Sequence, residues 1–357
     1  MVTSSSPVRQ RSPAECEVRR RPHIPPLCSV VVERAHEMTK PGERMTTPSE
    51  QAADDQRDPG LSAVMGERRQ LLNLAYRLLG SLADAEDVVQ ETYTRWYAMS
   101  RAEREAIESP GAWLTKVAGR VCLNLLGSAR ARRETYVGAW IPEPLPDPAE
   151  WIAGAAGGAG VDPADRITLD ESVTMAFLVV FESMTPAERV AFVLHDVFRY
   201  PFAEVAEIVG RSPAACRQLA SSARRRTAAR AEASPDAARQ ASVVRRFKAA
   251  WEAQDIEALV GLLDPDATAV ADGGGRAIAR LLPVEGAEQI ARFYLMIARL
   301  APPRTVLERS VNGLPGLVVE AGGQIETVFA FELADDERIK HIWAVRNPDK
   351  LRPWQLF

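Results

Sequence analysis

The chain has 357 residues, which is enough for two or three domains that each bury a core. It carries a net charge of −4, and no segment approaches the ~20 apolar residues of a membrane span. The N-terminal stretch also lacks the basic and then apolar plan of a signal peptide. These features predict a cytoplasmic protein that does not enter a membrane.

Cysteines and histidines are scattered along the chain rather than clustered. No Cys-x-x-Cys spacing occurs, and no histidine lies near a cysteine in a ligand-like pattern. We therefore expect no metal site, no disulfide and no cofactor. The residues concerned are Cys16, Cys28, Cys122, Cys216, His23, His36, His195 and His341.

Residues 1–60 are rich in Pro, Ser, Arg and Glu, with one brief apolar patch. Such a composition cannot bury enough apolar surface to offset the entropy lost on ordering, so we expect a disordered extension. Met45 and Met65 are alternative translation starts beside Met1.

The stretch 80–97 predicts a helix with two different faces. Its apolar stripe, at three- and four-residue steps, consists of Leu82, Ala85, Val89, Tyr93 and Trp96. Asp84, Asp87 and Glu91 follow the same steps on the other side, and Ser81 is placed to cap the helix. Periodicity alone favours an ordinary solvated surface helix.

The letters of this helix indicate more than its periodicity. Gly80-Ser-Leu-Ala-Asp-Ala-Glu-Asp-Val-Val-Gln-Glu-Thr92 resembles the second-region helix of extracytoplasmic-function sigma factors, and Trp113-Leu114 continues the match. The resemblance implies a promoter-specificity subunit that binds promoter DNA and core RNA polymerase, through the β′ clamp and the β flap. The implied clamp-docking residues are Asp84, Glu86, Asp87, Gln90 and Glu91.

Downstream, we expect a loop over 100–112, broken by Ser109-Pro-Gly, and a helix that begins at Trp113. This helix runs into the basic run Arg130-Ala-Arg-Arg133, a pattern that is also typical of a solvated helix end. The resembling family recognises the minus-ten promoter element here. The implied DNA contacts are Trp113, Lys116, Arg120, Asn124, Arg130, Arg132 and Arg133.

The composition then changes to Pro, Gly and Ala, which predicts an acidic linker over 136–165 that glycines loosen and prolines stiffen. Within it, Trp140-Ile-Pro-Glu-Pro144 resembles a short signature of one subgroup of these sigma factors.

Residues 201–220 predict a helix, a glycine turn at Gly210 and a second helix that Ser212 caps and Pro213 opens. In a helix-turn-helix the second helix enters the major groove, although an ordinary helical hairpin gives a similar pattern. With the resemblance, this domain corresponds to the one that recognises the minus-thirty-five element. Its expected DNA contacts are Arg211, Ser212, Ala214, Arg217, Gln218, Ser221, Arg224, Arg225 and Arg226.

The remaining chain predicts helices over 237–253, 256–263 and 286–300, together with short alternating strands. The first strand is expected at 268–271, after a turn at Asp264-Pro-Asp-Ala. This α+β pattern resembles the SnoaL-like, nuclear-transport-factor-2-like domains, which enclose a conical pocket. Such a pocket leaves room for a small ligand of unknown identity.

Two stretches of this last domain resemble signatures of sigma factors of the sigma factor J type. Asp272-Gly-Gly-Gly-Arg276, which by itself suits a flexible hairpin, matches the first, and Asn347-Pro-Asp-Lys-Leu351 matches the second. Glycines let another chain approach closely, so we expect these stretches to hold the DNA-binding domains in a fixed relation. The expected regulatory residues are Trp140, Pro142, Glu143, Pro144, Asp272, Gly273, Gly274, Gly275, Arg276, Asn347, Pro348, Asp349, Lys350 and Leu351.

The predicted fold is two all-α sigma domains, the second with a helix-turn-helix, followed by an α+β SnoaL-like cone. The expected boundaries are 1–60 for the extension, 61–135 for the first sigma domain, 136–165 for the linker, 166–232 for the second sigma domain and 237–353 for the SnoaL-like domain. We predict a sigma factor, not an enzyme, that its C-terminal domain regulates from within the chain. An operator-binding regulator with a ligand-sensing domain, or an isomerase- or hydrolase-type domain fused to a DNA-binding module, are the alternatives.

Overall fold

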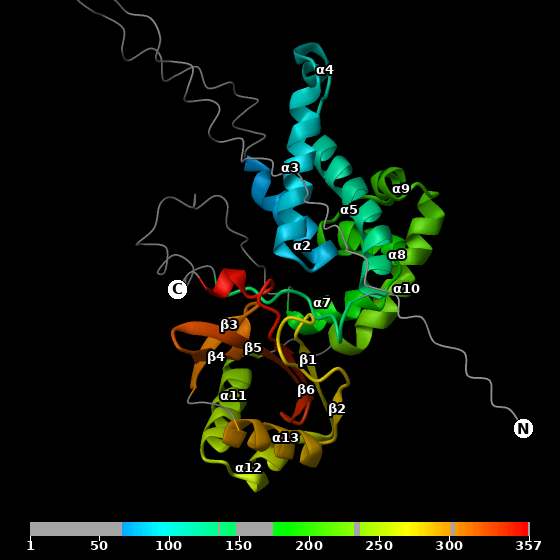
Figure 1. Ribbon diagram of the computed structural model, residues 1–357. Coiled ribbons are helices and arrows are strands. Elements are labelled where there is room, and N and C mark those ends of the chain that lie inside the picture. The colour runs from blue at the N-terminus through cyan, green and yellow to red at the C-terminus, as the bar shows by residue number, and fades with distance from the viewer. Residues whose placement is uncertain (1–65, 135, 148–173, 232–235, 301–303, 356–357) are drawn as a thin grey trace, which may run out of the picture. The chain divides into compact units, whose positions relative to one another are not determined.

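The computed structural model describes residues 66–134, 136–147, 174–231, 236–300 and 304–355, all within one compact unit, 57–357 (Figure 1). The expected extension 1–60 and residues 148–165 of the expected linker lie outside the described residues. None of the helices in the described ranges is long and apolar enough to cross a membrane.

The first helical domain contains α2 (Arg68–Leu79), α3 (Leu82–Ala98), α4 (Arg101–Glu105) and α5 (Pro110–Glu134). Ser81 caps α3 as predicted, since its Oγ accepts the Asp84 N–H at 3.3 Å. The expected loop over 100–112 is wrong. Ser100 and Glu103 form a capping box that starts α4, and Ser109 and Pro110 begin α5 three residues before Trp113.

The second helical domain contains α7 (Met175–Glu182), α8 (Pro186–Phe192), the π-helical turn η4 (Val193–Val197), α9 (Phe202–Val209) and α10 (Pro213–Ala231). Gly210 has φ +69° between α9 and α10, the left-handed conformation that glycine adopts without strain. The predicted helix-turn-helix is therefore present. One apolar cluster joins this domain to the first, because Leu194 and Ile208 belong to the same core as Leu74 and Leu114.

The C-terminal domain begins with two helices and continues as a six-stranded sheet in the order β2-β1-β6-β5-β4-β3. Its elements are α11 (Ala237–Glu252), α12 (Ile256–Leu262), β1 (Leu263–Asp272), β2 (Val284–Glu285), α13 (Ala287–Leu300), β3 (Thr305–Val311), β4 (Leu314–Ala321), β5 (Gln324–Leu333), β6 (Ile339–Val345) and the 3-10 turn η5 (Arg352–Trp354). Strand β1 pairs with β6 in parallel, and the other neighbours are antiparallel.

Strand β1 starts at Leu263 rather than after a turn at 264–267. Its pairing with β6 is irregular between Leu263 and Thr268, so the Asp-Pro-Asp-Ala segment is a bulge inside the strand. Strand β2, of only two residues, was not predicted because it is too short to show alternation.

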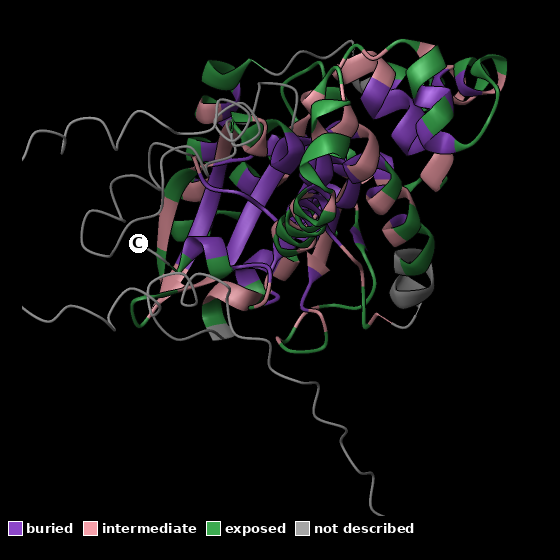
Figure 2. Ribbon diagram, turned by 90° about the horizontal axis from the view of Figure 1, so that it is seen from above, coloured by how far each residue is buried: buried purple, intermediate pink, exposed green. Residues whose placement is uncertain are grey.

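Both faces of the sheet are covered, and most of its length is buried (Figure 2). One face packs on α11 and α13 through a core that includes Phe247, Tyr294 and Phe329. The other face forms a smaller core with Ile141 of the linker and Met175 of α7. The sheet therefore joins the linker and the second helical domain to the C-terminal domain.

Candidate polymerase and promoter interface and its interdomain contacts

The acidic side of α3 is open to solvent. Glu86, Asp87, Gln90 and Glu91 are exposed, and Asp84 is half-buried. Glu91 pairs with Arg95 at 2.8 Å, one turn along the helix. Burial, with a smaller effect of the neighbouring Asp84 charge, raises the pKa of Asp87. The five predicted docking residues thus lie on one exposed face, which suits a basic partner surface.

A shallow groove runs between this face and α5. Asp87, Gln90 and Glu91 line one side, and Asn124 lines the other. A predicted minus-ten contact therefore lies directly beside the predicted clamp-docking residues.

The predicted minus-ten residues of α5 are divided between the core, the second helical domain and solvent. Trp113 packs edge-to-face on Trp96 at 5.3 Å between ring centroids. Lys116 forms an ion pair with the Glu207 carboxylate, and Arg120 donates to the Glu207 carbonyl at 2.9 Å. The side chains of Arg130, Arg132 and Arg133 lie outside the described residues, although their backbone belongs to α5.

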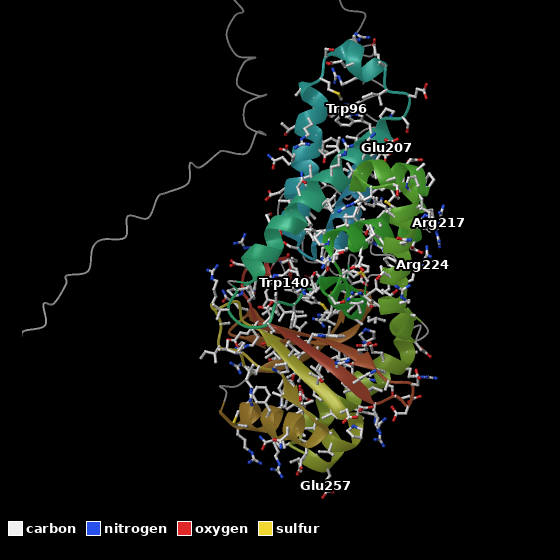
Figure 3. The ribbon with its side chains drawn as sticks, turned by 90° about the vertical axis from the view of Figure 1, so that its right-hand side faces the viewer. Trp96, Trp140, Glu207, Arg217, Arg224 and Glu257 are labelled. Atoms are coloured by element: carbon white, nitrogen blue, oxygen red, sulfur yellow. The ribbon has the colours of Figure 1, made fainter. Side chains whose placement is uncertain are left out.

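Helix α10, the second helix of the helix-turn-helix, and the turn before it present the predicted DNA contacts outward, as Figure 3 shows for Arg217 and Arg224. Those that are exposed are Arg211, Ser212, Ala214, Arg217, Gln218, Arg224, Arg225 and Arg226, and Ser221 is half-buried. Arg217 lies over the Phe202 ring at 5.3 Å, which holds its side chain near α9. Arg224 pairs with Asp196 at 2.6 Å.

Arg189 of α8 connects the two helical domains, a role that sequence reasoning missed. Its side chain is 3 % exposed and donates to the Leu78 carbonyl at the end of α2, to Glu182 at 2.9 Å and to the Phe181 carbonyl. Burial lowers the pKa of this guanidinium to about 9, which still leaves it charged at neutral pH. Only its place in a Thr-Pro-x-Glu-Arg helix start was visible in the sequence.

The three signature stretches meet at the Asp272 side chain, which is fully buried. One carboxylate oxygen accepts the Tyr136 hydroxyl at 2.6 Å, and the other accepts the Ile141 N–H at 2.9 Å and Lys350 Nζ at 2.6 Å. Lys350 also donates to the Ile141 carbonyl and lies 4.0 Å from the centre of the Trp140 ring. A buried charge thus has its opposite charge and its hydrogen bonds satisfied.

The glycines after Asp272 allow this close approach. Gly274 has φ +59°, and a Cβ there would collide with the Asn347 side-chain amide and lie 2.8 Å from the Tyr136 oxygen. Asn347 itself donates to the Tyr136 hydroxyl at 2.9 Å. A Cβ at Gly275 would lie 3.2 Å from Val137. Gly274 therefore requires glycine for space as well as for conformation, whereas the contact at Gly275 is only tight.

Glu143, in the middle of the linker signature, contacts the start of α3. Its carboxylate accepts the Leu82 N–H at 2.8 Å, and its backbone N–H donates to the Gly80 carbonyl at 2.8 Å. Burial raises the pKa of this carboxyl to about 7, against the opposing effects of the Leu82 N–H and Lys350. The linker thus supplies an extra cap to α3.

The linker segment around Glu143 is also held by three residues that sequence reasoning missed, namely Tyr76, Asn312 and Trp354. The Tyr76 hydroxyl donates to the Glu143 carbonyl at 2.7 Å and accepts from Asn312 Nδ2 at 2.8 Å. Trp354 Nε1 donates to the Pro144 carbonyl at 2.8 Å. Asn312 and Gly313 were visible only as a hairpin turn, which gives no sign of a distant partner.

Around Asp272, the remaining signature residues differ in burial. Leu351 is buried, whereas Arg276 and Asp349 form an ion pair near the surface. Pro142 lies against Gly80. Within the described ranges, no cluster of three His, Cys, Asp or Glu side chains could hold a metal ion.

Comparison with known proteins agrees with this arrangement. The Sigma-70 region 2 family model matches residues 63–132, and the Sigma-70, region 4 model matches residues 174–227. These matches cover the two helical domains.

Full-length relatives extend the agreement. The chain is 38 % identical to the ECF RNA polymerase sigma factor SigJ of Mycobacterium tuberculosis, over 79 % of this chain and 90 % of the relative. It is 34 % identical to the probable ECF RNA polymerase sigma factor SigI of the same organism, over 84 % and 97 %. The crystal structure of SigJ superposes with a TM-score of 0.64 at 35 % identity, covering 82 % of this chain and 98 % of that one.

The predicted fold class is therefore confirmed, with two helical sigma domains followed by an α+β SnoaL-like domain. These relatives are regulators of transcription. The chain belongs to the extracytoplasmic-function RNA polymerase sigma factors, which direct promoter-specific initiation of transcription.

Proposed function

We propose that this sigma factor docks on the β′ clamp through the acidic face of α3, contacts the β flap through its second helical domain, and is regulated by its own C-terminal domain. The observation that carries the docking proposal is the exposed row of Glu86, Asp87 and Glu91 along α3. Aligned carboxylates attract a basic surface over a Debye length and fix its register.

A charge-reversal experiment tests the docking. Asp87→Lys with Glu91→Lys should weaken binding to core polymerase and make the residual affinity less sensitive to salt. Glu257→Lys on α12, distant from α3 in Figure 3, is the control with the same type of charge change. Equal polymerase binding by the reversed and control proteins would remove the support for this face.

We assign minus-ten recognition to α5 and minus-thirty-five recognition to α10. Arg217 and Gln218 are our candidates for base contacts, since both are exposed on the outer side of α10. Arg224, Arg225 and Arg226 are our candidates for phosphate contacts, because they continue along the same helix as a basic track.

The two domains must separate before they can contact both promoter elements. The elements are roughly 25 base pairs apart, or about 85 Å of duplex at 3.4 Å per base pair. In the structure, however, α5 packs directly on α9, with Ile208 against Gly119 and Glu207 occupied by Lys116 and Arg120. We infer that this arrangement is a closed state in which part of the minus-ten surface is covered.

The C-terminal domain is our candidate for the regulator of that opening. It forms hydrogen bonds with the linker between the two helical domains through Asp272, Lys350 and Trp354. Since these groups are tethered to their targets, an effective concentration in the millimolar range favours contacts that would be weak between separate chains. A non-enzymatic role for this domain stays a prediction that the sigma-factor relatives support, and a cytoplasmic location also stays a prediction.

An operator-binding regulator is the competing hypothesis for the helix-turn-helix. Run-off transcription separates the two, because a sigma factor yields specific transcripts only when core polymerase is present. Specific promoter binding that neither needs nor responds to core polymerase would favour the operator-binding alternative.

A further inference from the structure

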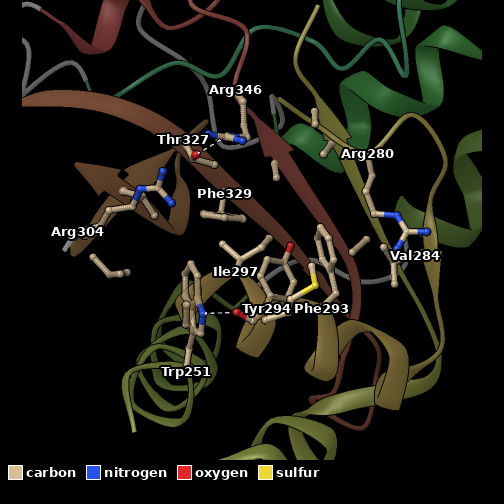
Figure 4. Close-up of a pocket in the computed structure, with 18 of the residues that line it drawn as sticks. Trp251, Arg280, Val284, Phe293, Tyr294, Ile297, Arg304, Thr327, Phe329 and Arg346 are labelled. Atoms are coloured by element: carbon tan, nitrogen blue, oxygen red, sulfur yellow. Dashed lines mark hydrogen bonds between the residues drawn. The ribbon is translucent and has the colours of Figure 1, made fainter. Parts of the chain in front are cut away.

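The C-terminal domain encloses a cavity of about 640 Å³ between α13 and the sheet. This volume falls in the range of sites that hold small organic ligands. Its floor is aromatic, with Trp251, Phe293, Tyr294 and Phe329 (Figure 4). Such a floor suits the apolar body of a ligand rather than a string of waters.

Three arginines lie around the cavity, as Figure 4 shows, with Arg346 at the top of the view, Arg304 at the left and Arg280 at the right. Arg304 pairs with Glu326 at 2.9 Å, and Arg280 lies over the Phe293 ring at 5.5 Å. Arg346 donates to the Thr327 hydroxyl at 3.2 Å and to the Ile278 carbonyl. The only acid that lines the cavity in the described residues is Glu252, whose side chain is 51 % exposed and lies near Lys248. The lining therefore carries an excess of positive charge.

One polar group of the cavity lining has no hydrogen-bond partner among the described residues. Arg304 Nε is buried without a hydrogen bond, and so is Oε2 of Glu326, the carboxylate with which Arg304 pairs. The Tyr294 hydroxyl points into the cavity in Figure 4. Buried polar groups are almost always satisfied, so the unsatisfied Arg304 nitrogen indicates room for a further acceptor beside Glu326.

The electrostatics of Arg346 point in the same direction. Burial, with a smaller effect of the Arg304 charge, lowers the pKa of Arg346, and Glu326 opposes this. An anion beside both guanidinium groups would relieve their repulsion and accept charge-assisted hydrogen bonds.

We propose that this cavity binds an anionic amphiphile, an organic carboxylate or phosphate whose apolar body lies on the aromatic floor and whose head contacts Arg304 and Arg346. A neutral ligand of the same shape would leave the positive charge of the lining uncompensated. The head group, rather than the apolar body, therefore distinguishes the ligand.

The site is one residue away from the interdomain contact. The backbone N–H groups of Arg346 and Asn347 both donate to the Asp272 carbonyl, at 2.7 and 2.9 Å. The Ile278 carbonyl that Arg346 holds lies in the segment that follows the Gly273–Gly275 run. A bound head group that draws Arg346 from Ile278 would therefore shift the segment against which Tyr136 and Val137 pack, an effect on regulation that rests on the proposed function.

Calorimetric titration of the full chain tests the site with sodium decanoate, decyl phosphate and decan-1-ol as probes. The two anions should bind about tenfold or more tightly than the alcohol, because they add charge-assisted hydrogen bonds. The tighter of the two anions identifies the head group. Equal affinity for the anions and the alcohol, or no binding of either anion, would overturn the proposal without any variant.

Arg304→Gln and Arg346→Gln should each weaken anion binding by about tenfold and leave decan-1-ol binding unchanged. Arg309→Gln is the matched control, since Arg309 is exposed on β3 and does not line the cavity. Anion affinity that is equal in the Arg304→Gln and Arg309→Gln proteins contradicts the assignment.

Hydrogen exchange of the Ile141 amide measures whether ligand binding in the cavity changes the contact between Asp272 and the linker. Saturating decanoate should change its exchange rate severalfold in the wild-type chain but not in the Arg346→Gln chain, and an unchanged rate in both overturns the link. Neither measurement needs polymerase, so a failure here is distinct from a failure of polymerase docking.

Discussion

The first helical domain makes two interfaces of different chemistry. Its contact with the second helical domain is largely apolar, with the buried Arg189 guanidinium donating to the Leu78 carbonyl. The Lys116–Glu207 ion pair lies at its edge, with side chains 38 % and 59 % exposed. Its contact with the linker and the C-terminal domain depends on buried polar groups, including Asp272 and Glu143. Exposed ion pairs contribute little and are screened by salt, whereas buried pairs are costly to break. The second interface, which depends on several buried polar groups, is therefore suited to holding the linker, whereas opening the first must also break the hydrogen bond from Arg189 to Leu78.

The largest expected effect comes from breaking the buried pair. Asp272→Asn leaves Lys350 charged and buried without its carboxylate, and should cost about 3–5 kcal/mol of unfolding free energy. Urea unfolding measures this, with Asp349→Asn as the control because that carboxylate pairs with Arg276 near the surface. Equal losses in the two variants would show that burial of the Asp272 network is unimportant.

The next effect is a pH dependence that arises from Glu143. Its folded pKa of about 7 lies above the ordinary 4.5, so its contribution to stability is complete below pH 4.5 and is lost as pH rises through 7. Glu143→Gln keeps an acceptor for the Leu82 N–H and should flatten this slope, gaining up to about 3 kcal/mol at pH 8. Unfolding curves from pH 4 to 8 should therefore diverge between the two proteins, and parallel curves would contradict the raised pKa.

A smaller effect tests the close approach at Gly274. Gly274→Ala should destabilise the chain by about 1–3 kcal/mol more than Gly322→Ala. Gly322 has nearly the same φ, +60°, but nothing lies within 4 Å of a Cβ there, so the difference isolates the contact with Asn347 and Tyr136. The thermal midpoints of the two variants give the comparison. Similar midpoints would mean that Asn347 and Tyr136 can move away from an added Cβ without loss of stability.

The smallest effect concerns the edge of the opening interface. Glu207→Gln removes the partner of Lys116 and should change stability by less than about 1 kcal/mol. It should also raise promoter-duplex affinity in the absence of polymerase by up to about fivefold, because Lys116 becomes available. Fluorescence anisotropy at low and high salt measures this, with the exposed Glu204→Gln on the same helix as control. An increase that persists at high salt, or that Glu204→Gln reproduces, would exclude release of the ion pair as its cause.

Signals that act over a few residues were predictable. Ser81 and Ser212 cap the helices they were expected to cap, and Gly210 makes the helix-turn-helix turn. The errors arose where a local signal was misinterpreted. Ser109-Pro-Gly was expected to lie in a loop, but it begins α5.

The sequence by itself determined the order of the elements, the family, and the three stretches that carry the interdomain contact. Only the tertiary structure decided what those stretches do, because the partners are far apart along the chain. Glu143 caps a helix that begins 61 residues earlier, and Lys350 reaches Asp272 across 78 residues. Periodicity and capping describe neighbours within a few turns, whereas the burial that makes these charges depend on one another arises when separate domains pack together.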